Sequence, residues 1–101
     1  ERHDFMLVAA DAIINHVNYI ERLSHGEYTE PIIIRAVTAD ASPCYSGPTH
    51  SQDFTELFRH ALDKNNMQIH EPTTGEQMAD TYDYAVKSNR PCMIIERKSL
   101  Y

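Results

Sequence analysis

The sequence predicts a small α/β domain, with a mainly parallel β-sheet flanked by helices in a three-layer αβα arrangement. Segments with helical spacing of apolar residues alternate with short apolar runs, in the order helix, strand, helix, strand, helix, strand. The strand-like runs lack polar alternation, which is typical of strands covered on both faces in a parallel sheet. Because crossovers between parallel strands are right-handed, this order places at least three strands between helices.

Length and charge set the first limits on function. The chain has 101 residues, which fits one small domain over residues 1–101. Its formal net charge of −6 argues against a nucleic-acid partner, since such proteins usually carry a basic face. No apolar run approaches the roughly 18 residues that a membrane span requires. Cys44 and Cys92 have no C-x-x-C spacing, which favours reduced thiols, as in bacterial cytoplasm or the mitochondrial matrix.

The first predicted helix runs from Asp4 to Leu23. Its apolar residues recur at spacings of three and four, which predicts one buried stripe. Asp4 is the expected N-cap, and Gly26 supplies a stop signal after the last turn. The stripe consists of Phe5, Val8, Ala9, Ala12, Ile13, Val17 and Ile20.

A buried strand is predicted over residues 31–37, followed by the longest loop of the chain, 38–49. The strand is rich in isoleucine, and the loop is rich in small residues, proline and glycine. Ligands of open parallel sheets bind beyond the carboxyl ends of strands, and loops longer than about 12 residues tend to be functional. This loop leads directly to His50.

The second half of the chain predicts two more helix–strand pairs. A helix from about Ser51 to Leu62 has Ser51 as its expected N-cap and Asp53 in its first turn, where it favours the helix dipole. A short strand over 66–72 ends at Pro72. A capping box from Thr74 to Gln77 then opens a helix over 73–88, and a buried strand covers 91–96. The apolar face of the first of these helices comprises Phe54, Leu57, Phe58 and Ala61.

His50 and Phe5 have two interpretations each. His50 is either an ordinary polar residue at a helix start or a proton or hydrogen-bond donor to a ligand, since imidazole titrates near neutrality and free helix amides favour anions. Phe5 is by default a core residue, and its second interpretation, as a residue that contacts a cofactor, depends on a family resemblance. Spacing alone leaves these alternatives open.

Metal and phosphate motifs are absent from the sequence. Its six histidines show no H-x-x-x-H or H-E-x-x-H spacing, and His16 and His60 fall on expected exposed helix faces, so we expect no metal site. No G-x-G-x-x-G or G-x-x-x-x-G-K loop occurs, and three glycines offer no cradle for a diphosphate.

Four segments together resemble one family: HDFMLVAADAIINHV, GPTHSQDFTELF, EPTTGEQMADTYDYAV and PCMIIERKSLY. The chain resembles the pyrimidine-binding, transketolase-like central domain of thiamine-diphosphate enzymes. The nearest branch is the β subunit of the decarboxylating component of 2-oxoacid dehydrogenase complexes. The family motifs are matched at Asp4-Phe5, residue for residue over Gly47–Gln52, over Pro72–Ala79, and at Glu96, Lys98, Leu100 and Tyr101.

The resemblance implies a thiamine-diphosphate fold and a function. Thiamine diphosphate, held with Mg²⁺ between two subunits, serves to decarboxylate a 2-oxoacid, and the acyl group passes to lipoyl on a partner acyltransferase. His50 is then a catalytic residue that faces cofactor and substrate. Phe5 is then a cofactor-binding residue whose ring packs against the aminopyrimidine.

The chain departs from the family in ways that point to a partial domain. The glutamate that activates the aminopyrimidine lies upstream of the D-F segment in relatives, and the diphosphate motif belongs to an α-type partner. Ser88 stands in the region where relatives bind a monovalent cation through an acidic residue. We therefore expect the chain alone to be inactive and to self-associate through an open sheet edge or a helix.

Two alternatives share the fold. A transketolase or deoxyxylulose-phosphate-synthase type enzyme would transfer two-carbon units between sugars. A non-catalytic interaction module would keep the fold without the chemistry.

Overall fold

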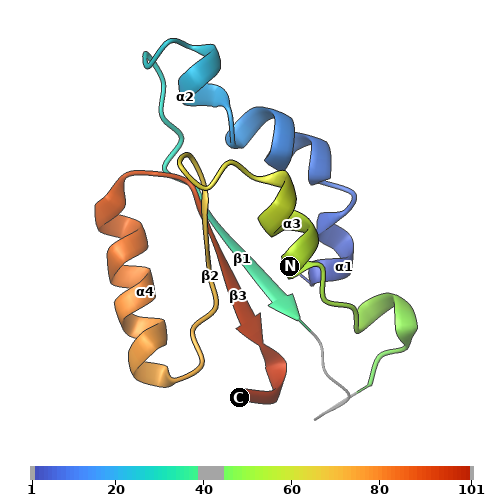
Figure 1. Ribbon diagram of the computed structural model, residues 1–101. Coiled ribbons are helices and arrows are strands. Elements are labelled where there is room, and N and C mark those ends of the chain that lie inside the picture. Colours follow the sequence, from blue (N-terminus) through green and yellow to red (C-terminus); the bar gives the residue numbers. More distant parts are fainter. Residues whose placement is uncertain (1, 39–44, 101) are drawn as a thin grey trace.

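The computed structural model describes residues 2–38 and 45–100. It is an α/β fold with an all-parallel three-stranded sheet and helices (Figure 1). The strands are β1 (Ile33–Thr38), β2 (Gln68–His70) and β3 (Cys92–Arg97), in the order β1-β3-β2. The predicted strands, their parallel pairing and their alternation with helices are confirmed.

Alternate residues of the central strand β3 supply two hydrophobic clusters, because successive strand side chains point to opposite faces. Met93 and Ile95 pack in one cluster with residues of the N-terminal helices and of α3 (Thr55–Ala61). Cys92 and Ile94 pack in the other with Ala85 of α4 (Gly75–Ser88). Figure 1 shows α4 on one side of the sheet and α1 and α3 on the other. Strand β3 is therefore covered on both faces, as its unbroken apolar run predicts.

The predicted single helix over Asp4–Leu23 is wrong in detail, because this stretch is divided. It consists of α1 (His3–Met6), the π-helical segment η1 (Ala12–Val17) and α2 (Ile20–Leu23), with turns at residues 7–9 and 18–19. In η1 the Asn18 amide donates to the Ile13 carbonyl at 3.0 Å, five residues back, which widens the turn. The end after Leu23 is as predicted, with His25 and Gly26 at positive φ.

The division changes which residues are buried. After α1, the amides of residues 8–10 donate to carbonyls three residues back, and η1 follows with a wider turn, so a spacing counted from the sequence does not hold along this stretch. Val8 is 88% exposed, and Ala9 and Ala12 are also exposed. The buried residues are Met6 and Ile13, together with the polar side chains His3 and Asn18.

Two expected N-caps are wrong and one is confirmed. Asp4 lies inside α1, and α3 begins at Thr55, four residues after Ser51, because Pro48–His50 form a 3₁₀ turn, η2, and irregular residues follow it. Thr74 caps α4 as predicted, with its hydroxyl accepting from the Gln77 amide at 3.1 Å.

Two further expectations concern Leu57 and the cysteines. Leu57 is 46% exposed rather than buried, whereas Phe58 on the same helix is fully buried. Cys92 is a buried free thiol, and burial raises its pKa. Cys44, the middle of the predicted loop (39–44) and Tyr101 lie outside the described residues.

Candidate functional site

The rings of Phe5 and His50 lie against each other. Their centroids are 5.3 Å apart and their planes meet at 73°, an edge-to-face contact. Phe5 comes from α1 and is 49% exposed, so it is not the core residue that its apolar spacing predicts by default. His50 ends η2 and is partly buried. The structure thus brings together the two residues that the sequence singled out.

The His50 side chain is oriented by its neighbour. Its Nδ1 lies 2.9 Å from the Thr49 hydroxyl. Within the described part of the chain, Nε2 of His50 has no hydrogen-bond partner. The imidazole therefore keeps one nitrogen available beside the Phe5 ring.

The backbone around His50 is held by three consecutive residues, Arg2, His3 and Asp4, which we name the N-terminal clasp. Each makes one hydrogen bond to an alternate residue of the segment 50–54. These bonds run from Arg2 Nη1 to the His50 carbonyl (2.9 Å), from the Phe54 amide to His3 Nδ1 (3.1 Å) and from the Gln52 amide to Asp4 Oδ1 (3.3 Å).

The clasp lies beside the carboxyl end of β1. Arg2 forms an isolated parallel bridge with Val37, and α1 packs against both β1 and η2. The expected location of a site, beyond the carboxyl end of a parallel strand, therefore agrees with where His50 is held.

His3, the middle residue of the clasp, is fully buried. Its ring stacks on Phe58 with centroids 5.8 Å apart and meets Phe54 edge-on at 6.2 Å. Burial lowers the pKa of His3, and the nearby charges of Asp53 and Asp4 oppose this only in part. Since Nδ1 accepts the Phe54 amide, the proton of the neutral ring is on Nε2. No pattern in the sequence marked His3 as a buried residue.

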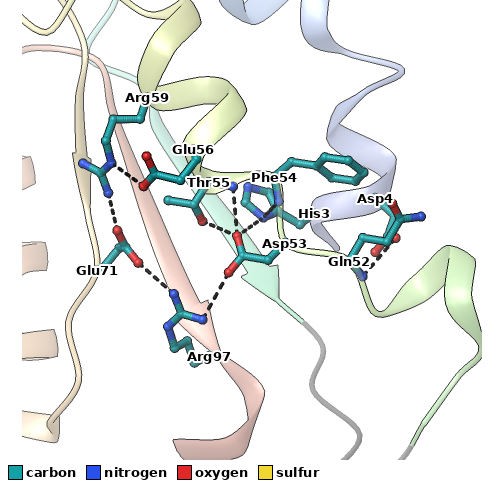
Figure 2. Close-up of polar contacts among 10 residues, drawn as sticks. All are labelled: His3, Asp4, Gln52, Asp53, Phe54, Thr55, Glu56, Arg59, Glu71 and Arg97. Carbon is teal, nitrogen blue, oxygen red and sulfur yellow. Dashed lines mark hydrogen bonds and ion pairs between the residues drawn. The ribbon is translucent and has the colours of Figure 1, made fainter.

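A chain of alternating charges extends from the clasp across the sheet end (Figure 2). Asp53 accepts from Arg97 at 3.1 Å, and Arg97 donates to Glu71 at 2.9 Å. Arg59 bridges Glu71 and Glu56. These ion pairs tie the start of α3 to the carboxyl ends of β2 and β3.

Asp53 takes the capping role that the sequence assigned to Ser51. Its Oδ1 accepts from the Thr55 amide at 2.9 Å and also from the Thr55 hydroxyl. Burial alone would raise the pKa of Asp53, but the bonds from Thr55 and the charge of Arg97 lower it overall. The position of Asp53 near a helix start was visible in the sequence, whereas its distant partner Arg97 was not.

A second charged group lies within the fold rather than at the site. Glu96 is 3% exposed and accepts two hydrogen bonds from Arg35, at 2.6 and 2.8 Å. The Tyr82 hydroxyl donates to the same carboxylate at 2.7 Å. Because its oxygens are paired, Glu96 reads as a structural residue that joins β1, β3 and α4.

A small cavity of about 140 Å³ lies apart from the Phe5–His50 pair, at the start of α4 and the carboxyl ends of β2 and β3. Arg97 belongs to its wall, so the ion-pair chain connects the two places. The lining residues are Pro72, Thr73, Thr74, Gly75, Met78, Arg97 and Leu100.

The remaining sequence candidates lie elsewhere. His16 is 68% exposed and His60 is exposed, as expected. The Ser88 hydroxyl donates to the Ala85 carbonyl at the end of α4. In residues 2–38 and 45–100, no group of three or more His, Cys, Asp or Glu side chains is arranged to hold a metal ion. None of the helices described is both long and apolar enough to cross a bilayer.

Fold and geometry together define an α/β domain with a parallel sheet, in which a histidine and an aromatic ring from distant segments meet beside the end of β1. No protein-family model matches the chain, and no curated protein matches it significantly.

Proposed function

We propose that the chain is the pyrimidine-binding part of a thiamine-diphosphate-dependent 2-oxoacid dehydrogenase, of the β-subunit type. The observation that carries the proposal is the contact of Phe5 with His50. The motif resemblance assigns both residues to the cofactor without using any spatial information. Their meeting in space, 45 positions apart in the chain, is the arrangement that one shared ligand requires.

The residues present suit the aromatic half of the cofactor. The Phe5 ring is half-exposed and its contact with His50 is T-shaped. Apolar ring surface is therefore left for a planar heterocycle. The described residues offer no glycine-rich loop for a diphosphate. We therefore assign the diphosphate and its Mg²⁺ to an α-type partner, and the pyrimidine to this chain.

His50 is the residue we assign to the substrate. In the tautomer whose Nδ1 accepts from the Thr49 hydroxyl, 2.9 Å away, the ring proton lies on Nε2. From there the imidazole can donate a hydrogen bond to the carboxylate of a 2-oxoacid or to the oxyanion that develops from its keto group. Bound thiamine diphosphate supplies the nucleophilic carbon for decarboxylation. The clasp holds the His50 backbone while this bond forms.

The surface beside the pair favours a partner. Phe5, Leu7 and Val8 are 49%, 42% and 88% exposed, which is unusual for three apolar residues so close in sequence. An α-type subunit that completes the cofactor site would cover this surface. A lipoyl acyltransferase would receive the acyl group. A three-layer thiamine-diphosphate fold, here partial, and a location in bacterial cytoplasm or mitochondrial matrix belong to the same proposal.

The test is turnover of the protein assembled with its α-type subunit. We expect release of CO₂ from a 2-oxoacid and acyl transfer to lipoyl, both dependent on added thiamine diphosphate and Mg²⁺. His50→Ala should lower turnover by about 10²–10⁴-fold, the usual contribution of a positioned proton donor. His60→Ala, at an exposed position on α3, is the matched control and should leave turnover unchanged.

Other outcomes separate the alternatives. Turnover of sugar phosphates without turnover of 2-oxoacids would favour the transketolase type. Assembly without cofactor binding or turnover would favour a non-catalytic module. Unchanged turnover in His50→Ala would remove His50 from catalysis.

A further inference from the structure

The N-terminal clasp contains one bond that depends on protonation. Arg2 donates a guanidinium N–H to the His50 carbonyl, and Asp4 accepts the Gln52 amide with a carboxylate oxygen. The middle bond is different, because the Phe54 amide donates to His3 Nδ1 at 3.1 Å. A protonated imidazole carries a hydrogen on both nitrogens and accepts at neither. The middle bond therefore exists only while His3 is neutral.

A competing acceptor stands beside His3. Asp53 Oδ1 lies 3.5 Å from His3 Nδ1, close to hydrogen-bond distance. Protonated His3 would turn its Nδ1–H toward Asp53 and leave the Phe54 amide without its acceptor. The same Asp53 oxygen accepts from the Thr55 amide at the start of α3, so this turn would also disturb that helix start.

The other charges around His3 act in both directions. Asp4, its neighbour in α1, and Asp53, from the turn before α3, favour its protonated form, whereas Arg97 of β3 opposes it. Its other ring contacts, Phe54 and Phe58, are uncharged. His3 Nε2 is also buried and has no hydrogen-bond partner among the described side chains and backbone. The buried environment thus favours neutral His3. If His3 is protonated, the new hydrogen on Nδ1 has Asp53 Oδ1 as its nearby acceptor, 3.5 Å away.

We propose that His3 is a positioning residue for His50. Protonation of His3 breaks its bond with the Phe54 amide and so releases one of the three bonds that hold the segment 50–54. The Phe5–His50 contact is then held firmly at neutral pH and loosened in acid. The consequence for catalysis rests on the proposed function. The conformational change itself does not, since it involves only residues of this chain.

The experiment is a pH titration of the chain by ¹H–¹⁵N NMR, without cofactor or partner. We expect the Phe54 amide resonance and the His50 ring resonances to shift together with the titration of the His3 ring. The Phe54 amide should also exchange with solvent faster once His3 is protonated. A Phe54 amide that does not shift while His3 titrates would overturn the proposal.

The variant His3→Asn sharpens the test. Its side-chain oxygen can take the place of Nδ1 as acceptor, but it does not titrate. The His3-dependent part of the Phe54 and His50 shifts should disappear in this variant and persist in the control His60→Asn. If the resonances of His3→Asn show an unfolded chain, the titration of the unaltered protein alone decides.

Catalysis provides a separate readout. In the assembled enzyme, His3→Asn should flatten the acid limb of the pH profile of kcat/KM, and His60→Asn should not. An inactive assembly would contradict the proposed function and leave the NMR result intact. An active assembly in which the Phe54 amide resonance does not shift with the titration of His3 would contradict only the role of His3.

Discussion

The Phe5 ring meets the His50 ring edge to face, with centroids 5.3 Å apart. Phe5 lies near the start of the chain, and His50 follows its longest predicted loop. An aromatic side chain that is half-exposed beside a histidine with an available nitrogen is poorly explained by core packing. Under the proposed function, this contact is the surface that the pyrimidine of the cofactor would meet.

Replacing Phe5 should affect stability much less than replacing a true core phenylalanine. Phe5 is 49% exposed and Phe58 is fully buried. Phe5→Ala should lower the free energy of unfolding by about 1 kcal/mol, from half-burial of the ring. Phe58→Ala should lower it by about 3–5 kcal/mol, because it leaves a cavity. Urea denaturation of both variants measures the difference, and equal losses would make Phe5 a core residue.

The carboxylate of Glu96 should stabilise the fold through its charge. Glu96→Gln leaves the Arg35 guanidinium facing a neutral amide and weakens the bond from Tyr82. We expect a loss of about 1–3 kcal/mol, reduced from the value for a fully buried pair because Arg35 is 59% exposed. Glu56→Gln, in the exposed pair with Arg59, should cost less than about 0.5 kcal/mol. Similar losses in both variants would contradict the structural role of Glu96.

Thr74 and Ser51 should differ as helix caps. Thr74→Ala removes the acceptor of the Gln77 amide and should cost about 1 kcal/mol. The Ser51 hydroxyl is buried without a partner among the described residues, so Ser51→Ala should change stability by less than about 0.5 kcal/mol. Chemical denaturation resolves the two. A loss for Ser51→Ala as large as that for Thr74→Ala would contradict this difference.

The fold should lose stability in mild acid. Burial lowers the pKa of both His3 and His70, so the unfolded chain binds their protons more readily than the folded chain. Stability is therefore full above the ordinary histidine pKa of about 6.5 and falls as the pH drops toward the lower folded-state values. Asp53, whose pKa is lowered overall despite its burial, adds a further loss only below the ordinary aspartate range.

Urea midpoints measured from pH 8 down to pH 5 follow this loss. His70→Gln should make the stability curve flatter, because the variant has no buried imidazole to protonate at this position. His16→Gln, at an exposed position, is the control and should keep the slope of the unaltered chain. A pH-independent midpoint in the unaltered chain would contradict the prediction.

Self-association should be measurable as a concentration-dependent mass. Both β1 and β2 are edge strands of the described sheet. Among the described residues, the outer side of β1 pairs only with Arg2, through one isolated bridge. Ile32→Lys should weaken association through this edge, and Val8→Lys should weaken association through the exposed turn that follows α1. Sedimentation equilibrium of the two variants tells the surfaces apart. A monomer at high concentration in the unaltered chain would reject both.

Local sequence signals predicted most of the secondary structure. The unbroken run in β3 predicted a strand buried on both faces, because each face needs its own apolar residues. Thr74 predicted its helix start, since the hydroxyl and the Gln77 amide that it caps are three residues apart. The prediction for the first helix was less accurate, because the helix is interrupted between α1 and η1, and in the divided stretch Val8 lies at the surface and His3 in the interior.

By itself, the sequence determined the α/β class, the parallel strands and the choice of Phe5 and His50, because these depend on patterns within short stretches. Only the tertiary structure decided that the two rings touch, that Arg2, His3 and Asp4 hold the His50 segment, and that Asp53 pairs with Arg97. The physical reason is that these contacts join residues more than 40 positions apart. Their geometry depends on how the helices pack on the sheet, which no local spacing records.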